Sequence, residues 1–314
     1  LRRMTEQRPP FDLSQGPVAA IQVVRLGETD HVVAMRIHHI AFDGWSLGVL
    51  AREIVALYPA FLAGRPCPLP PLSIQYADFA VWQRRVMQTD RLARLRTHWQ
   101  ARLAGLPPLD LSADYPRPSV RTSRGNTLPV ALSPDLSRAV LEFSRRERVT
   151  PFMTLLAGFQ ELLRRYSGQE DFAVGTPTAN RRQKTFEPLV GYFINVLVLR
   201  ADLHGDPSFR ELVRRVRDTS LDAYENQDLT LDKIAEAVQP ERDLSRHPLF
   251  QVMFVLQNNP SLSFRLPGLE ATPAGPVEDA ASAKFELTMP LRVTAEGIVG
   301  VLNYNRDLFA ATRM

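Results

Sequence analysis

Two adjacent histidines followed by an Asp-Gly pair are the residues of this sequence best suited to chemistry. The stretch from His38 to Gly44 reads HHIAFDG. A neutral imidazole near physiological pH can take a proton from a nucleophile or orient it by a hydrogen bond, which acyl transfer to an amine or a hydroxyl requires. Side chains of neighbouring strand residues point in opposite directions. We therefore expect one of His38 and His39 to serve catalysis and the other to serve structure.

Asp43 and Gly44 favour a tight turn directly after the histidines. A carboxylate at this position could pair with an arginine and hold the loop, so we interpret Asp43 as a brace and not as a general base. Taken alone, the motif fits equally well a strand end with two hydrogen-bonded histidines. Metal binding is disfavoured, because adjacent strand residues do not easily reach one ion and the other histidines show no ligand spacing.

The residues on either side of the motif predict a strand, a turn and a helix. Residues 32–37 are β-branched and apolar, which favours a buried strand. Residues 47–62 carry apolar side chains at helical spacing, and Ser46 is the expected N-cap. The histidines thus lie in a short polar turn between two regular elements, a position that commonly exposes reactive side chains.

Strand and helix patterns are mixed along the rest of the chain and predict an α/β fold. Residues 74–103 are largely helical, and residues 188–203 are dense enough in Val, Ile and Leu to indicate a strand buried on both faces. Further strands are expected at 128–132, 172–176, 250–256, 286–293 and 297–304, and further helices at 134–148, 151–166, 209–226 and 231–238. Residues 106–124 contain four prolines. We therefore expect a linker at 106–127 between a first lobe at 1–105, which holds the motif, and a second lobe at 128–314.

Composition argues against several classes of function. The sequence pI is about 9.4, but the net charge is only +4 and acidic residues are interleaved with basic ones, which disfavours nucleic-acid binding. Cys67 is the single cysteine, so an internal disulfide or a multi-cysteine metal site is excluded. No run of eighteen uncharged apolar residues is present, which argues against a membrane span. We expect a soluble protein of the reducing cytoplasm.

The motif resembles the HHxxxDG signature of condensation domains of non-ribosomal peptide synthetases, and further segments resemble that family in the family's order. They are FDLSQGP at 11–17, YADFAVWQ at 76–83, VGTPTANR at 174–181, VGYFINVLVLR at 190–200, RDLSRHPLFQVMFVLQN at 242–258 and LNYNRDLF at 302–309. The resemblance implies two chloramphenicol-acetyltransferase-like lobes arranged in a V. It also implies amide formation between acyl groups held as thioesters.

Carried over to this chain, the resemblance implies roles for His39 and Gly44, and we infer the roles of their neighbours. His39 would orient or deprotonate the acceptor amine in a channel between the lobes, and Gly44 would offer a backbone N–H to the reacting carbonyl. Asp43 is expected to pair with Arg181, with His38 and Trp45 as structural neighbours. Channel candidates are Ser46 and Asn195, the latter more readily as a structural residue.

The same resemblance implies partners and no bound cofactor or metal. Substrates would arrive on the phosphopantetheine arms of upstream and downstream peptidyl carrier domains, beside an adenylation domain. The family's opening SxAQxRLWF and RHxxLRT segments are absent, its HQDxPFE segment reads NQDLTLD at 226–232, and a final helix is expected after Met314. We therefore expect an incomplete first lobe, and a chain that is inactive and poorly soluble when expressed alone.

Four alternatives lie within or near the family. Epimerase domains share HHxxxDG but read DGVSWR after it, whereas this chain continues with Trp45 and Ser46. Heterocyclisation domains replace the histidines with aspartate, and non-catalytic docking domains of the same fold tend to lose them. A free-standing acyltransferase with a small soluble acceptor also fits the motifs. Amide formation is the function that the resemblance favours.

Overall fold

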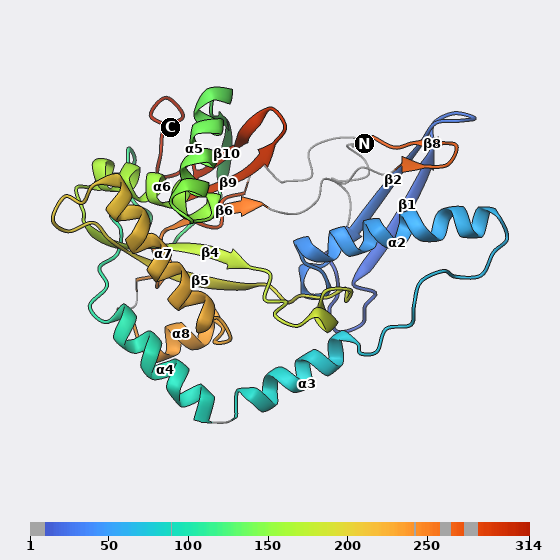
Figure 1. Cartoon of the computed structure of the whole chain (residues 1–314), viewed down its shortest axis with the longest axis horizontal. Helices are drawn as coiled ribbons and strands as arrows, with labels where there is room; N and C mark the ends of the chain where they lie inside the picture. The colour runs from blue at the N-terminus through green and yellow to red at the C-terminus, as the bar shows by residue number, and fades with distance from the viewer. Residues whose placement is uncertain (1–9, 89, 242, 258–264, 273–281) are drawn as a thin grey trace. The chain divides into compact units, whose positions relative to one another are not determined.

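The computed structural model describes residues 10–88, 90–241, 243–257, 265–272 and 282–314. Arg242 and Asn258, at the ends of one family motif, lie outside these residues. The chain forms two compact units that interleave along the sequence (Figure 1). Unit 1 comprises Leu1–Gln83, Arg181–Ile194 and Asn259–Val277, and unit 2 comprises Arg84–Asn180, Asn195–Asn258 and Glu278–Met314.

Unit 1 contains a β-hairpin followed by the histidine motif and a long helix. Strands β1 (Ala19–Arg25) and β2 (His31–Ile37) pair antiparallel, with Ala19 opposite Ile37. A 3-10 helix (His39–Ala41) comes next, and then α2 (Gly44–Leu62). Helix α3 (Tyr76–Val86) begins in this unit, which also holds a 3-10 helix (Lys184–Phe186) and the short strands β7 (Arg265–Leu266) and β8 (Leu269–Glu270).

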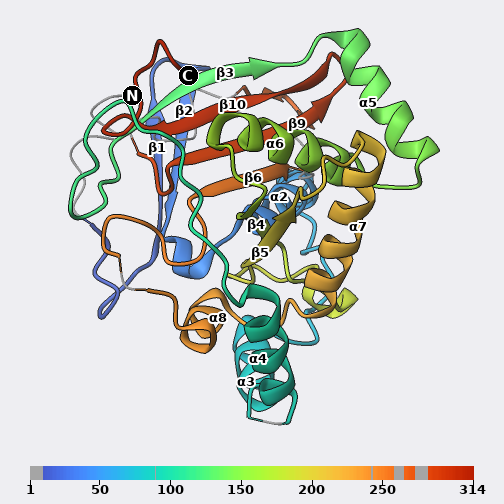
Figure 2. The same cartoon turned by 90° about the vertical axis from the view of Figure 1, so that its left-hand side faces the viewer.

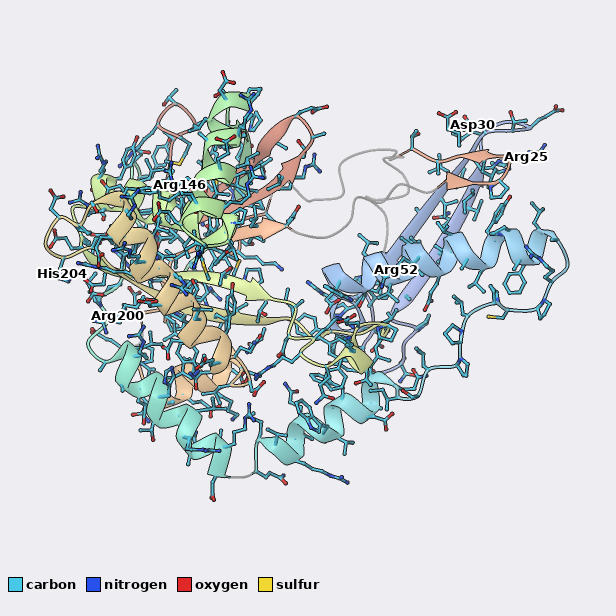
Figure 3. All side chains as sticks on the ribbon, viewed as in Figure 1. Arg25, Asp30, Arg52, Arg146, Arg200 and His204 are labelled. Atoms are coloured by element: carbon cyan, nitrogen blue, oxygen red, sulfur yellow. The ribbon has the colours of Figure 1, made fainter. Side chains whose placement is uncertain are left out.

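Helix α2 begins at an aspartate cap and not at the serine that the sequence predicted. The N-cap is Asp43, whose Oδ1 accepts a hydrogen bond from the backbone N–H of Ser46 at 2.8 Å. Both residue types are good N-caps, and the contacts of Asp43 elsewhere in unit 1 decide between them. Within the described residues α2 is the one helix that is long and apolar enough to span a membrane. Core helices of soluble proteins can have the same length and composition. Arg52 stands near its middle (Figure 3), where a charge is costly in a bilayer.

Unit 2 is built on a mixed six-stranded sheet in the order β3-β10-β9-β6-β4-β5. Pairing is parallel between β4 and β6 and between β6 and β9, and antiparallel elsewhere. The strands are β3 (Gly125–Ala131), β4 (Asp171–Thr178), β5 (Asn195–Asp202), β6 (Val252–Gln257), β9 (Leu287–Thr294) and β10 (Gly297–Asn305). The helices are α4 (Asp90–Leu103), α5 (Pro134–Arg146), α6 (Pro151–Ser167), α7 (Phe209–Glu225) and α8 (Leu231–Val238). Figure 2 shows α5, α6 and α7 beside this sheet.

The core of unit 2 explains why its elements were predictable. Helices α5 and α6 start with Ser133 and Thr150 as N-caps, each followed by a proline at the first helical position. The apolar face of α6 and both faces of β4 and β5 are buried in one cluster, which includes Leu156, Phe172 and Leu197 at 0% exposure. Burial of this kind stabilises the fold by about 25 cal/mol per Å² of apolar surface.

The predicted α/β class is confirmed, and the structure refines the elements expected along the chain. The strand expected at 188–203 is limited to β5, because residues 190–194 bond to the start of α2 instead of to a neighbouring strand. The largely helical pattern at 74–103 is confirmed and consists of two helices, α3 and α4, with a turn at Gln88. Strand β1 was not predicted. Its apolar residues alternate with polar ones only in part, so the pattern is weak.

The segment predicted as a linker packs into unit 2, and it does not connect two lobes that are each continuous in sequence. Leu109 and Leu111 are buried, and the N–H of Leu109 donates to Gln251 Oε1 at 2.8 Å. Arg117 forms a bidentate pair with Glu286 at 2.7 and 3.1 Å. The compact units thus differ from the predicted segments 1–105, 106–127 and 128–314. Proline content indicated irregular backbone correctly, but it carried no information about these distant contacts.

Candidate active site

His39 is exposed, and its hydrogen-bond partner indicates which ring nitrogen carries the hydrogen. Its Nδ1 lies 2.5 Å from the backbone carbonyl oxygen of Phe42. A carbonyl only accepts, so Nδ1 carries the hydrogen and donates it. In the neutral ring Nε2 then keeps its lone pair. The ring is therefore in the tautomer that a general base acting through Nε2 requires.

His38 is held in a different way, as the cap of the 3-10 helix that follows β2. Its Nδ1 accepts a hydrogen bond from the backbone N–H of Ile40 at 3.1 Å. Its ring also makes an edge contact with Phe11, with centroids 6.0 Å apart. The sequence predicted that the two histidines would diverge because they alternate in a strand, but β2 ends at Ile37. The turn geometry separates them instead.

Asp43 and Arg181 form the ion pair that the sequence predicted. Their side chains are 2% and 1% exposed, and an Nη atom of Arg181 lies 3.2 and 3.4 Å from the two carboxylate oxygens. Asp43 also accepts from the backbone N–H of Ser46 at 2.8 Å and of Phe193 at 3.0 Å. One carboxylate thus joins the start of α2 to the loop at 181–194.

Arg181 extends this junction through its second terminal nitrogen. This nitrogen donates to the carbonyl oxygens of Phe186 at 2.5 Å and Leu189 at 2.7 Å. The guanidinium also stacks over the Phe193 ring at 3.9 Å. Burial lowers the pKa of Arg181, and the charge of Asp43 opposes that shift. A buried charge with this many partners holds the loop in one conformation and would be costly to leave unpaired.

Ser46 is a structural residue of this junction and not a channel residue as predicted. It is 0% exposed. Its Oγ lies 2.8 Å from Asp43 Oδ1 and 2.9 Å from the Gly191 carbonyl oxygen, and it accepts the Gly191 N–H at 3.0 Å. The hydroxyl is fully engaged inside unit 1. Next to it, Trp45 Nε1 donates to the carbonyl oxygen of Glu187 at 2.9 Å.

Several residues of the site were not singled out by the sequence. A Cβ on Gly191 would lie 2.2 Å from the ring of Tyr76, so this close approach requires glycine. The Tyr76 hydroxyl donates to the carbonyl oxygen of Tyr192 at 2.8 Å. Burial raises the pKa of Tyr76, and the negative charge of Asp43 raises it further. Phe193 packs with Phe79 in a small aromatic core, at a centroid distance of 4.5 Å.

Gly44 and Asn195 differ from each other in solvent exposure. Gly44 is exposed as the first residue of α2, where backbone N–H groups lack an intrahelical partner. Asn195 belongs to unit 2 and is 7% exposed. Its amide donates to the carbonyl oxygens of Gln227 at 2.7 Å and Leu229 at 2.8 Å, and its Oδ1 accepts from Val196. These polar atoms brace the loop before α8. Among the described residues no group of three or more His, Cys, Asp or Glu side chains could hold a metal ion.

A family model described as Condensation domain matches residues 2–314. The chain belongs to the condensation domain family. This condensation domain is 44% identical over 320 residues to one of the linear gramicidin synthase proteins of Brevibacillus parabrevis, a match that covers 98% of the chain and 6% of that protein. It is also 43% identical to malpinin synthetase of Mortierella alpina, a match that covers 98% of the chain and 4% of that protein.

Solved structures agree with this assignment. The X-domain from teicoplanin biosynthesis superposes with a TM-score of 0.86 at 29% identity, covering 99% of this condensation domain and 71% of that chain. A four-domain nonribosomal peptide synthetase bound to AMP and glycine superposes with a TM-score of 0.82 at 25% identity, covering 97% and 24%. The mixed α/β architecture is therefore that of known condensation domains.

Proposed function

We propose that this domain forms an amide bond between a donor acyl or peptidyl group and an acceptor amine, both held as thioesters on carrier domains. The observation that carries the proposal is the hydrogen bond from His39 Nδ1 to Phe42 O, which leaves Nε2 as the basic atom of an exposed ring. Relatives at 44% identity are parts of peptide synthetases, which is the context that such a reaction needs.

In the proposed reaction the acceptor nitrogen attacks the donor thioester carbonyl. The new C–N bond forms and the C–S bond breaks, so the thiol of the donor arm is the leaving group. His39 Nε2 would orient the amine, take its proton and return it to the departing sulfur. The oxyanion that develops would accept from the N–H of Gly44, at the positive end of the α2 dipole. Much of the acceleration would come from holding the two substrates together.

The partners follow from this chemistry. Phosphopantetheine arms of upstream and downstream peptidyl carrier domains would deliver both substrates, with an adenylation domain loading the acceptor carrier. The domain itself would need no bound cofactor or metal. A cytoplasmic location fits the single, exposed Cys67 and the supply of amino acids.

The test is His39→Ala in the natural polypeptide that carries this sequence. Loaded donor and acceptor carriers are mixed with it, and released dipeptide is measured by mass spectrometry. We expect a loss of at least about a hundredfold, the usual contribution of a positioned acid or base. His31→Ala is the matched control, since His31 is an exposed histidine of β2. Dipeptide formation by His39→Ala at near the control rate would contradict the proposal. If the wild type reacts as fast with coenzyme A thioesters as with carrier-bound thioesters, the result would instead indicate a free-standing acyltransferase.

A second candidate is a docking domain of the same fold. The structural likeness to the X-domain of teicoplanin biosynthesis favours it, because one solved structure is a complex of that X-domain with OxyB. The presence of both His38 and His39, one of them in a base-competent tautomer, supports the catalytic proposal over this one. A wild-type protein that binds a partner enzyme but forms no amide would favour the docking role over the catalytic one.

A further inference from the structure

The imidazole of His39 has a second contact besides its hydrogen bond. The ring of Tyr192 meets it edge to face, with centroids 5.1 Å apart and planes at 87°. The Phe42 carbonyl restrains only the Nδ1 corner of the imidazole. An aromatic ring perpendicular to the imidazole limits rotation about that corner, since such pairs have a preferred geometry. The two contacts together define the direction in which Nε2 points.

Tyr192 is itself held by backbone bonds on both sides. Before it, the N–H of Gly191 donates to Ser46 Oγ at 3.0 Å, and after it, the N–H of Phe193 donates to Asp43 Oδ2 at 3.0 Å. Its own carbonyl oxygen accepts the Tyr76 hydroxyl at 2.8 Å. Three successive residues are thus tied to the start of α2 and to α3. These bonds fix the backbone from which the Tyr192 ring projects.

The exposure of Tyr192 argues against a role as core filler. Tyr192 is 40% exposed, whereas its neighbour Phe193 is 2% exposed and fills the aromatic core of unit 1. A large, partly exposed ring on a pinned backbone, directed at one imidazole, has the features of a support for that imidazole. Asp43 and Arg181 then support the site indirectly, because they hold the backbone that carries Tyr192.

We propose that Tyr192 is a positioning residue for His39, whose ring contact keeps Nε2 in the direction needed for proton transfer. The inference rests on the proposed function for its catalytic consequence, but the contact itself can be tested without any reaction. Loss of one aromatic pair should reduce kcat by about fivefold. KM should change little, because Tyr192 acts through His39 and not on the carrier arms.

The experiment compares Tyr192→Leu with Tyr192→Phe in the natural polypeptide that carries this sequence. Leucine removes the ring, whereas phenylalanine retains it and loses only the hydroxyl. Tyr166→Leu is the control, since Tyr166 is an exposed tyrosine on α6 in unit 2. The readouts are kcat and KM for dipeptide formation, and the nitrogen and Cε1–H resonances of isotope-labelled His39, which report its tautomer and its aromatic neighbour.

We expect Tyr192→Leu to shift the His39 resonances and to lower kcat, and Tyr192→Phe and Tyr166→Leu to resemble the wild type. Unchanged His39 resonances in folded Tyr192→Leu would overturn the inference. A Tyr192→Phe variant as impaired as Tyr192→Leu would also overturn it, since the ring would then not be the acting group. If the wild type forms no amide but the resonances respond as expected, the contact stands and the proposed function fails.

Discussion

Removing the charge of Asp43 should loosen the loop at 181–194 by a measurable amount. In Asp43→Asn the remaining oxygen can still accept from Ser46, but the amide nitrogen replaces the acceptor of the Phe193 N–H. The guanidinium of Arg181 also loses its counter-charge while it stays buried. Breaking a buried pair from one side costs about 3–5 kcal/mol. Arg181→Met should cost a similar amount, because it leaves the Asp43 carboxylate unpaired and removes the donors to the Phe186 and Leu189 carbonyls.

A double-mutant cycle with hydrogen exchange isolates the pair. The N–H of Phe193 bonds to Asp43 and reports local opening of the junction. Each single variant should speed its exchange by about a hundredfold or more, which corresponds to about 3 kcal/mol. The double variant Asp43→Asn with Arg181→Met should cost clearly less than the sum, with a coupling of about 1–3 kcal/mol.

Lys233→Met is the matched control for this cycle. Its partner Glu236 lies 2.8 Å away, but both side chains are about half exposed, so the pair should contribute less than about 0.5 kcal/mol. Additive effects of the two unit 1 substitutions, within about 0.5 kcal/mol, would refute the idea that Asp43 and Arg181 act as a pair. Asp43 would then support the loop through its bonds to backbone N–H groups alone.

Further predictions concern His38, Gly191 and His247. His38→Ala should cost about 1 kcal/mol through loss of the cap to Ile40, and should retain far more amide-forming activity than His39→Ala; equal losses in folded protein would invert the two roles. Gly191→Ala should destabilise by about 1–3 kcal/mol by urea unfolding, because its Cβ would meet the Tyr76 ring at 2.2 Å, and unchanged stability would disprove that packing. Burial, with the nearby positive charge of Arg121, lowers the pKa of His247 to about 4. The unfolded state then binds the proton first, so unfolding free energy should fall by roughly 3 kcal/mol as the pH drops from 6.5 to 4; a His247→Phe variant with the same pH dependence would refute this.

Local signals in the sequence determined the regular elements of unit 2 and the candidate base. Caps such as Ser133 and Thr150, prolines at first helical positions and clean apolar spacing all act within a few residues of the element they specify. The histidine motif is local too, and the bond from His39 to Phe42 closes within four residues. For such features the order of residues along the chain contains nearly all of the relevant physics.

Tertiary structure decided everything that depends on partners far apart in the sequence. The run at 190–194 has the composition of a strand, yet the side chains of Asp43 and Ser46, nearly 150 positions away, take its backbone hydrogen bonds. The same distance explains why Ser46 was misassigned to a channel and why the role of Tyr192 was invisible. Most buried polar groups in folded proteins have hydrogen-bond partners, and the fold determines which partners are within reach.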